Sequence, residues 1–302
     1  MNLAIVILNW NSKQETLGCL QSVTSINFPH FEIILVDNGS SEAPAEEFQE
    51  LYPQIRLLRN EENFGFAEGC NRGIAYALER GADYVLLLNN DARVDPEILN
   101  AFMQAAEAYP DAGVFGAKIY YYDEPTVLWY AGGEVDSKRG LCYHEGCLES
   151  DLEKKWESIR DTGYACGCAL FIRADVIQTV GFMDPQFFLI WEEIDWCWRI
   201  RAAGYRCLFV PDAKVWHKIS ASFEGGNRGP LWEYFYRRNR LLFLKRYYPS
   251  FFYRIAFWQE PLRHLVGCLN PRFDKEKRQQ HRAALSGVCD YFRGRFGPKI
   301  KS

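Results

Sequence analysis

The sequence lacks several patterns that would place it in a familiar class. Its ten cysteines include no C-x-x-C pair, so a zinc ribbon or a thioredoxin-type site has little support. The start has no basic leader, and its apolar run from Leu3 to Leu8 is too short for a signal peptide or a membrane span. We therefore expect a cytosolic protein with reduced thiols.

A glycine-rich phosphate loop is also missing where a dinucleotide-binding fold would need it. The turn after the first predicted strand reads Asn9-Trp10-Asn11-Ser12, which matches neither G-x-G-x-x-G nor G-x-x-x-x-G-K-[ST]. Such loops let the backbone approach a pyrophosphate closely. The sequence therefore argues against NAD and against a P-loop nucleotide.

Strong net charge is absent as well, but the formal balance of −4 over 302 residues hides an asymmetry. Residues 237–302 hold 16 Lys and Arg against 4 Asp and Glu, whereas residues 1–236 hold 19 against 35. This acidic body with a basic tail disfavours a uniformly basic nucleic-acid binder. It is compatible with a tail that seeks an anionic surface.

The sequence does contain a regular succession of apolar runs typical of buried strands. Four of them fall in the first 120 residues, at 3–8, 31–36, 55–58 and 84–88. Their hydrophobicity is unbroken, as a strand covered on both faces requires. Short helices are predicted between them, at 14–23, 45–51 and 72–80. This alternation predicts an α/β protein with a parallel, doubly wound sheet.

Beyond residue 95 the predicted elements are mixed. They are a helix to about 109, a strand at 114–119, hairpins at 120–164, a strand at 169–173, a helical segment at 187–201, strands at 207–210 and 215–217, and a helix at 232–248.

Polar clusters follow each of the four early strands. They are Asn9-Trp10-Asn11, Asp37-Asn38-Gly39-Ser40, 60–63 and Asn89-Asn90-Asp91. In an open α/β sheet the ligand lies outside the carboxyl ends of the strands, so we expect the clusters to converge on one crevice. The alternative is that they are ordinary turn residues, because Asn, Asp, Gly and Ser all favour turns.

Eight strings, in order along the chain, resemble the rhamnosyltransferase-like members of glycosyltransferase family 2. They are VILNWN, ILVDNGS, NFGFAEGCNRG, LLLNNDARVDP, GCALFIRADVIQTVGFMDPQFF, WEEIDWCWRIRAAGY, VWHKIS and YFYRRNRLLFLKRYYP. The resemblance covers about residues 1–248 and implies a GT-A fold with a mostly parallel sheet. It implies a GT-A domain at 1–236, with a nucleotide-sugar-binding half at 1–120 and an acceptor-binding half at 121–236. A basic, aromatic helical extension at 237–302 follows.

The activity that the resemblance implies is inverting, metal-dependent transfer of a sugar such as rhamnose. The donor would be a dTDP- or UDP-sugar, and the acceptor a hydroxyl of a cell-surface polysaccharide or a lipid-linked glycan. Two alternatives stay open: a sugar nucleotidyltransferase, and a glycan- or membrane-binding module with weakened catalysis. The first would want a glycine-rich loop with a basic residue after the first strand, which is absent.

The resemblance also implies a nucleotide site. Asp37 would accept a hydrogen bond from the imide N–H of uracil or thymine, while Asn9 and Asn11 would hold the base and ribose. Asn71 would open a helix whose N–H groups face an anion. The full set expected at the nucleotide is Asn9, Asn11, Asp37, Asn38, Gly39, Asn63, Gly65, Phe66, Asn71, Asn89 and Asn90.

Asn89-Asn90-Asp91 occupies the place of the family's D-x-D metal motif, so Asp91 is the only charged ligand there. Mg²⁺ or Mn²⁺ prefers carboxylate oxygens and enters with phosphates, which makes one carboxylate workable. His217, in the setting His217-x-x-Ser220, matches a histidine that the fold often supplies to the metal or diphosphate. The alternatives are a turn-shaping Asp91 and a structural His217.

The resemblance aligns the catalytic base with Glu193, within Trp191-Glu192-Glu193-Ile194-Asp195. A positioned carboxylate can accelerate such a proton transfer by ~10²- to 10⁴-fold. Asp195 would either function in the site or form an i,i+4 surface pair with Arg199. The floor where donor sugar and acceptor meet is expected to contain Gly167, Cys168, Trp191 and Glu192.

The tail mixes aromatic and basic residues. Residues 249–270 are too charged to span a bilayer but suit a helix lying in its interface. With the positive balance of the tail, this predicts peripheral contact of 249–302 with anionic lipid on the inner face of the cell membrane. The rival interpretation is a helical subdomain that packs on the body or on a second subunit of a homodimer.

Overall fold

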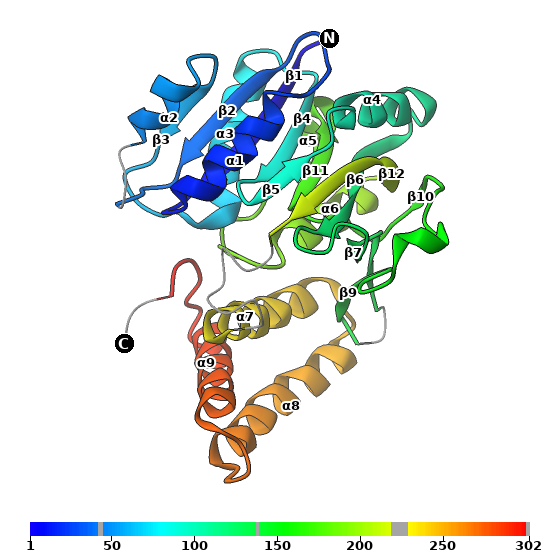
Figure 1. Cartoon of the computed structure of the whole chain (residues 1–302). Coiled ribbons are helices and arrows are strands. Elements are labelled where there is room, and N and C mark those ends of the chain that lie inside the picture. The colour runs from blue at the N-terminus through cyan, green and yellow to red at the C-terminus, as the bar shows by residue number, and fades with distance from the viewer. Residues whose placement is uncertain (42–44, 137–138, 219–228, 300–302) are drawn as a thin grey trace.

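The computed structural model describes residues 1–41, 45–136, 139–218 and 229–299. A large mixed sheet with helices on both faces lies above a group of three helices (Figure 1). The sheet order is β10-β12-β6-β11-β4-β1-β2-β3, with β5 paired to β12 and β7 to β6. The GT-A type α/β architecture expected from the sequence is confirmed.

The first half of the sheet is parallel, as expected. It consists of β1 (Leu3–Asn9), β2 (Glu32–Asp37), β3 (Arg56–Arg59) and β4 (Tyr84–Asn89). The helices of this half are α1 (Lys13–Val23), α2 (Glu46–Leu51) and α3 (Gly65–Glu79). In α3 the residues Ala67, Cys70, Ile74 and Ala77 recur at helical spacing and are buried.

The second half departs from a purely parallel sheet. Here β11 (Ala169–Arg173) runs antiparallel between β4 and β6 (Ala112–Tyr121). The two strands expected at 207–210 and 215–217 form one strand, β12 (Arg206–His217), with an irregularity after Val210. The remaining elements are β5 (Ala92–Val94), α4 (Ile98–Ala108), β7 (Leu128–Tyr130), β8 (Gly133–Val135), β9 (Cys142–His144), η1 (Asp151–Glu153), β10 (Arg160–Asp161) and α5 (Ala174–Val180).

The helix expected over 187–201 begins late, as α6 (Glu192–Ala202). Phe188, Ile190 and Trp191 have φ values of 63°, 69° and 84°. Right-handed helix requires a negative φ, so the segment before Glu192 is an irregular loop. The loop leads directly into Glu192 and Glu193 at the start of α6.

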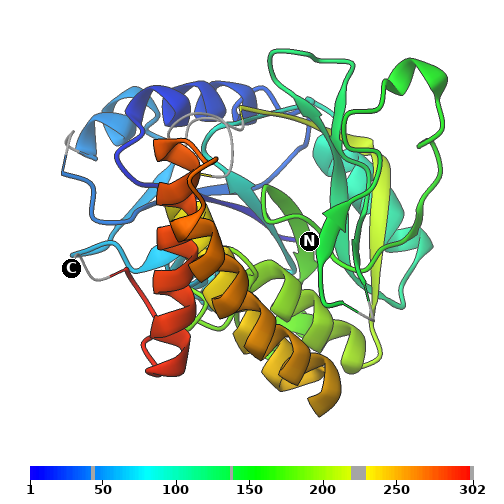
Figure 2. The same ribbon diagram turned by 90° about the horizontal axis from the view of Figure 1, so that it is seen from below.

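The C-terminal helices form a unit of their own. They are α7 (Pro230–Tyr247), α8 (Ser250–Leu269) and α9 (Lys275–Phe292). Both α8 and α9 pack against α7, and they diverge from the turn between them (Figure 2). The division expected after residue 236 falls inside α7. Among the described residues, no helix is long and apolar enough to cross a membrane.

Candidate active site

The strand-end clusters converge, as expected, through a chain of hydrogen bonds. Nδ2 of Asn90 donates to Oγ1 of Thr16 at 2.8 Å, and that hydroxyl donates to Oδ1 of Asn9 at 2.9 Å. Nδ2 of Asn9 donates to Oδ1 of Asp37, also at 2.9 Å. The ends of β4, β1 and β2 are thus joined into one polar edge.

Asp37 is fully buried in this edge, and one of its oxygens has no hydrogen-bond partner. Oδ1 is taken by Asn9, whereas Oδ2 has only the Nε of Arg59 at 3.9 Å. A buried acceptor without a donor is costly. A ligand N–H is the kind of group that would satisfy it.

Asn11, Gly39 and their neighbours shape the turn beside Asp37. The backbone N–H of Asn11 donates to Oγ of Ser40, and Oδ1 of Asn11 accepts from the N–H of Ser41. Gly39 has φ +73°, and a Cβ there would lie 2.5 Å from the carbonyl carbon of Glu62. Glycine is therefore required at this position.

The turn before α3, at residues 63–65, is held by hydrogen bonds of nearby side chains. Nδ2 of Asn38 donates to Oδ1 of Asn63 at 3.0 Å and to the carbonyl of Gly65 at 3.1 Å. Oδ1 of Asn63 accepts from the N–H of Gly65 at 2.8 Å. The side chains of Asn38 and Asn63 therefore order the turn.

The expected anion site at the start of the third helix is not free. The helix begins at Gly65, so Asn71 lies in its second turn and not at its opening. The N–H groups of Phe66 and Ala67 both donate to the carbonyl of Phe188. Asn71 in turn exchanges two hydrogen bonds with the backbone of Met183, at 2.8 and 3.1 Å. Asn71 is a buried cross-link between α3 and the segment before α6.

Asp91 and His217 lie together at the other end of the polar edge. Nε2 of His217 is 3.0 Å from Oδ1 of Asp91 and 3.4 Å from Nδ2 of Asn89. Nδ1 of His217 is buried and has no hydrogen-bond partner. Within the described part of the chain, no group of three or more His, Cys, Asp or Glu side chains is arranged for a metal. Ser220 lies outside the described residues.

These groups fit a divalent cation that enters with phosphates. One carboxylate and one imidazole, with the Asn89 side-chain amide nearby, form a partial donor set whose remaining positions phosphate oxygens and water would fill. The unpaired Nδ1 shows that the hydrogen bonding of His217 is incomplete in the protein alone.

Glu193 lies at the start of α6, against the turn that precedes β11. A Cβ placed on Gly167 would be 3.7 Å from Cβ of Glu193 and 3.5 Å from the ring of Phe66. Gly167, Phe66 and Glu193 therefore surround one small space. The carbonyl of Cys168 accepts from the N–H of Asn89 at 2.9 Å, which ties this turn to the cluster of Asp91.

The two neighbouring glutamates differ in their electrostatics. Burial, followed by the charge of Glu193, raises the pKa of Glu192 well above its usual value. Burial also raises the pKa of Glu193, but backbone N–H groups of Glu193, Ile194 and Gly167 oppose it. The electrostatics therefore favour the protonated form of Glu192 more strongly than that of Glu193.

Three expected sugar-contacting side chains are inside the core. Trp191 is fully buried and packs on Tyr236 and Phe243, so its ring offers no face to a sugar. Cys168 is buried, and burial raises the pKa of its thiol well above 9. Glu192 is 4% exposed. Gly167, the fourth expected floor residue, is buried as well.

Asp195 is also buried, so the surface-pair interpretation is wrong. Oδ2 accepts from Nε of Arg199 at 2.9 Å, while Oδ1 accepts from the hydroxyl of Tyr247 at 2.7 Å and from Arg246 at 3.2 Å. This carboxylate joins α6 to the end of α7.

Residues 4–179, more than half of the chain, match the family model for Glycosyl transferase family 2. The chain belongs to this family. The expected resemblance is thereby confirmed.

Relatives of this family 2 chain include two rhamnosyltransferases. It is 27% identical over 209 residues to N-acetylglucosaminyl-diphospho-decaprenol L-rhamnosyltransferase of Mycobacterium tuberculosis, covering 61% of this chain and 66% of that protein. It is 25% identical over 254 residues to dTDP-rhamnosyl transferase RfbF of Shigella flexneri, covering 81% of this chain and 80% of that protein. The match thus spans just under two thirds of the mycobacterial relative.

Solved structures share the fold of this family 2 chain at low identity. GalNAc-T7 with UDP, GalNAc and Mn²⁺ has a TM-score of 0.64 at 14% identity, covering 97% of this chain and 56% of that one. Mannosyltransferase PcManGT from Pyrobaculum calidifontis with GDP-Man and Mn²⁺ has a TM-score of 0.59 at 13% identity, covering 96% of this chain and 86% of that one.

With the family and its relatives known, the alternative of a sugar nucleotidyltransferase is not favoured.

Two buried residues of the family 2 chain hold the loop before Glu193, a role that the sequence motifs did not predict. Arg238 and Asn239 are completely buried in α7. Nη2 of Arg238 donates to the carbonyl of Phe187 at 2.9 Å, and Nδ2 of Asn239 lies within 2.9 Å of three carbonyls, those of Phe187, Leu189 and Ile190. The signal was present in the string YFYRRNRLLFLKRYYP, where Asn239 lies in the four-residue polar run 237–240 between an aromatic and an aliphatic segment.

Proposed function

We propose that this chain is an inverting, metal-dependent glycosyltransferase. It moves a sugar such as rhamnose from a dTDP- or UDP-sugar to a hydroxyl of a polysaccharide or lipid-linked glycan. The observation that carries the proposal is that Glu193 and the Asp91–His217 pair are linked at one edge of the sheet through the turn at Gly167 and Cys168. The rhamnosyltransferases among its relatives support the choice of sugar.

Nucleotide recognition is assigned to the ends of β1 and β2. The unpaired Oδ2 of Asp37 would accept the imide N–H of uracil or thymine. Asn9 orients that carboxylate, and Asn11 and Gly39 shape the turn beside it. Since both pyrimidines carry the same imide, this contact selects UDP- or dTDP-sugars without distinguishing them.

Asp91 and His217 would hold Mg²⁺ or Mn²⁺, with Asn89 beside them. When bound, such a cation neutralises the charge that develops on the diphosphate leaving group. Two neighbours in fold, GalNAc-T7 and PcManGT, have been crystallised with Mn²⁺. The Mn²⁺ ions in these two structures support the proposal of a divalent cation at Asp91 and His217 in this chain.

Glu193 would act as the base that takes the proton from the acceptor hydroxyl. It ionises before Glu192. The residue as a whole is half-buried, and its Oε2 is enclosed without a hydrogen-bond partner, which the acceptor hydroxyl would supply. A base facing the acceptor on the side opposite the leaving group gives inversion at the anomeric carbon. Glu192, by staying protonated, would leave the single negative charge of the pair on Glu193.

The test is turnover with defined donors. The full chain is incubated with dTDP-rhamnose, UDP-glucose and UDP-N-acetylglucosamine, with and without Mn²⁺, in the presence of a diphospholipid-linked N-acetylglucosamine acceptor. Release of nucleoside diphosphate is measured. We expect acceptor-dependent release that needs the metal and occurs with at least one pyrimidine donor. No release with any donor would leave a catalytically weakened glycan-binding module as the better description.

A further inference from the structure

Helix α8 exposes a row of large apolar residues and buries the polar side chains of Glu260 and His264. Its large exposed side chains are Phe251, Ile255, Trp258, Leu262, Leu265, Val266 and Leu269. Except for Val266, they follow one another at intervals of four and three residues, which places them on one face of the helix. We call this face the α8 stripe. Trp258 and Leu269 are 72% and 75% exposed, so the stripe projects into solvent.

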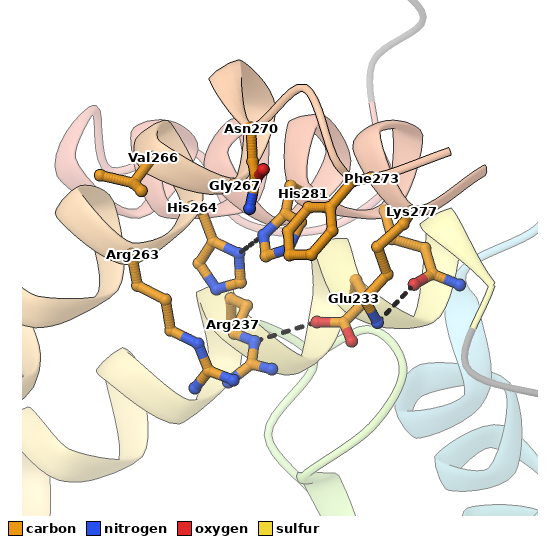
Figure 3. A pocket seen from close by; sticks show the side chains of 11 residues that line it. Glu233, Arg237, Arg263, His264, Val266, Gly267, Asn270, Phe273, Lys277 and His281 are labelled. Carbon is orange, nitrogen blue, oxygen red and sulfur yellow. Dashed lines mark hydrogen bonds and ion pairs between the residues drawn. The ribbon is translucent and has the colours of Figure 1, made fainter. Parts of the chain in front are cut away.

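The opposite face of α8 is held by a buried polar network. Glu260 is bonded to Arg240 at 2.5 Å and to Nε2 of His264 at 3.1 Å. Nδ1 of His264 lies 3.0 Å from Nδ1 of His281 in α9, toward which it points (Figure 3). Despite burial, His264 and the guanidinium groups of Arg237 and Arg240 lower the pKa of Glu260 to about 2.

This network fixes the orientation of α8. Rotating the helix to bury the stripe would take Glu260 and His264 out of their bonds and leave Arg240 without its carboxylate. Breaking a buried ion pair is strongly destabilising, so the stripe faces outward as part of the fold. Exposed apolar patches of this extent are uncommon on a chain that has no partner.

The charges around the stripe favour an anionic partner. Arg254 and Arg263, both exposed, lie on α8 to either side of it. Arg263 also lines a pocket of about 290 Å³ together with Val266 and Lys277 (Figure 3). The sequence from 237 to 302 carries 16 Lys and Arg against 4 Asp and Glu. A second copy would bring two basic surfaces together, whereas an anionic surface would be attracted.

The shape of the stripe favours a bilayer surface over a protein groove. It is about 100° wide and mixes two aromatic with five aliphatic residues, as in helices that lie in the membrane interface. From Phe251 to Leu269 it extends about 27 Å along the helix axis. Figure 1 shows α8 on the side of the helical unit away from the sheet, and the exposed face of the helix is therefore open to a flat surface.

We propose that the α8 stripe docks this chain onto a membrane that contains anionic lipid. The apolar side chains enter the interface, and Arg254, Arg263 and Lys277 meet the lipid phosphates. This docking does not depend on the donor, on the acceptor or on turnover. It nevertheless links to the site, because α7, which packs against α8, also holds the loop before Glu193 through Asn239.

The experiment is co-sedimentation of the full chain with vesicles of phosphatidylcholine alone or with phosphatidylglycerol added. We expect binding to the anionic vesicles that weakens with salt, and little binding to the neutral ones. The double variant Leu262→Glu, Leu265→Glu should reduce binding about tenfold or more. The matched control is Leu152→Glu, because Leu152 is 78% exposed on the body of the protein. It should bind as the wild type does.

Thermal unfolding of each variant checks that the fold is intact, as expected for changes at exposed positions. Two results would overturn the proposal. One is binding that the double variant does not change. The other is absence of binding to the anionic vesicles, whether or not analytical ultracentrifugation shows a homodimer that the double variant separates into monomers. Such a homodimer would assign the stripe to another copy of this chain.

Discussion

Nδ2 of Asn239, in the middle of α7, lies 2.7 Å from the carbonyl oxygen of Ile190, two residues before Glu192 opens α6. The loop around Ile190 runs through positive φ at three non-glycine residues, which is strained and exposes its carbonyls. The Asn239 amide satisfies them. The C-terminal helical unit therefore sets the approach to the proposed base.

Replacing Asn239 should impair catalysis more than nucleotide binding. In Asn239→Ala the loop carbonyls lose their donor, so Glu193 is held less well, and we expect kcat to fall about tenfold or more. Affinity for the nucleoside diphosphate, measured by isothermal titration calorimetry, should change less than about twofold. Asn100→Ala serves as the control, because the half-buried Asn100 in α4 donates to Asn27 and Glu97 and not to the loop. Equal losses in kcat and in nucleotide affinity would argue against a positioning role.

The pH dependence of turnover should report the raised pKa of Glu193. The base must be ionised, so kcat/KM falls as the pH drops through that pKa. Because burial raises the pKa above the usual value near 4.5, the acidic limb should lie at higher pH than for an exposed glutamate. In Glu192→Gln, kcat/KM should still fall at acidic pH. The midpoint of that fall should shift to lower pH by less than about one unit, because the residue that was replaced is mostly protonated. An acidic limb at the pH of an ordinary glutamate would contradict the assignment.

Glu192→Gln should also stabilise the fold at neutral and higher pH. The pKa of Glu192 is raised in the folded state, so the folded protein keeps a proton that the unfolded chain releases above about pH 4.5. The stability of the wild type therefore declines as the pH rises from the unfolded toward the folded pKa, by about 1.4 kcal/mol per pH unit. Urea unfolding should give nearly equal stabilities at about pH 4 and an advantage of the variant at about pH 8. A constant difference across this range would show that Glu192 does not titrate in this way.

Asp91 should be needed for the metal but not for the pyrimidine. We expect Asp91→Ala to weaken the binding of Mn²⁺ in the presence of UDP or dTDP by about tenfold or more, because the one carboxylate ligand is lost. Binding of the nucleotide without metal should be nearly unchanged. Binding of Mn²⁺ is measured by the loss of the free Mn²⁺ signal in electron paramagnetic resonance, and binding of the nucleotide without metal is measured by calorimetry. Asp95→Ala, four residues along the chain, is the control.

The sequence was sufficient for the sheet and for the convergence of its polar clusters. Apolar runs such as 84–88 can be buried only as central strands, and the residues that follow them must then meet at one edge. Asn9, Asp37 and Asn90 lie where this reasoning predicts.

Other features depend on tertiary contacts that a local pattern does not contain. The start of α6 is set by positive φ at Phe188, Ile190 and Trp191, residues that seldom adopt it unless distant groups stabilise the loop. The sequence alone suggests that Asp195 forms a surface pair with Arg199, but the contact with α7 buries its carboxylate. The apolar stripe of α8 is visible in the sequence, but only the bonds of Glu260 and His264 show that it faces outward.

The most direct measurement of the central claim compares Glu193→Gln with Glu192→Gln. Metal-dependent release of nucleoside diphosphate is followed in both, and a thermal shift with the donor shows that each variant still binds it. The account predicts that Glu193→Gln loses turnover by about 10²-fold or more, while Glu192→Gln keeps most of it. Full activity of Glu193→Gln, with donor bound, would contradict the account.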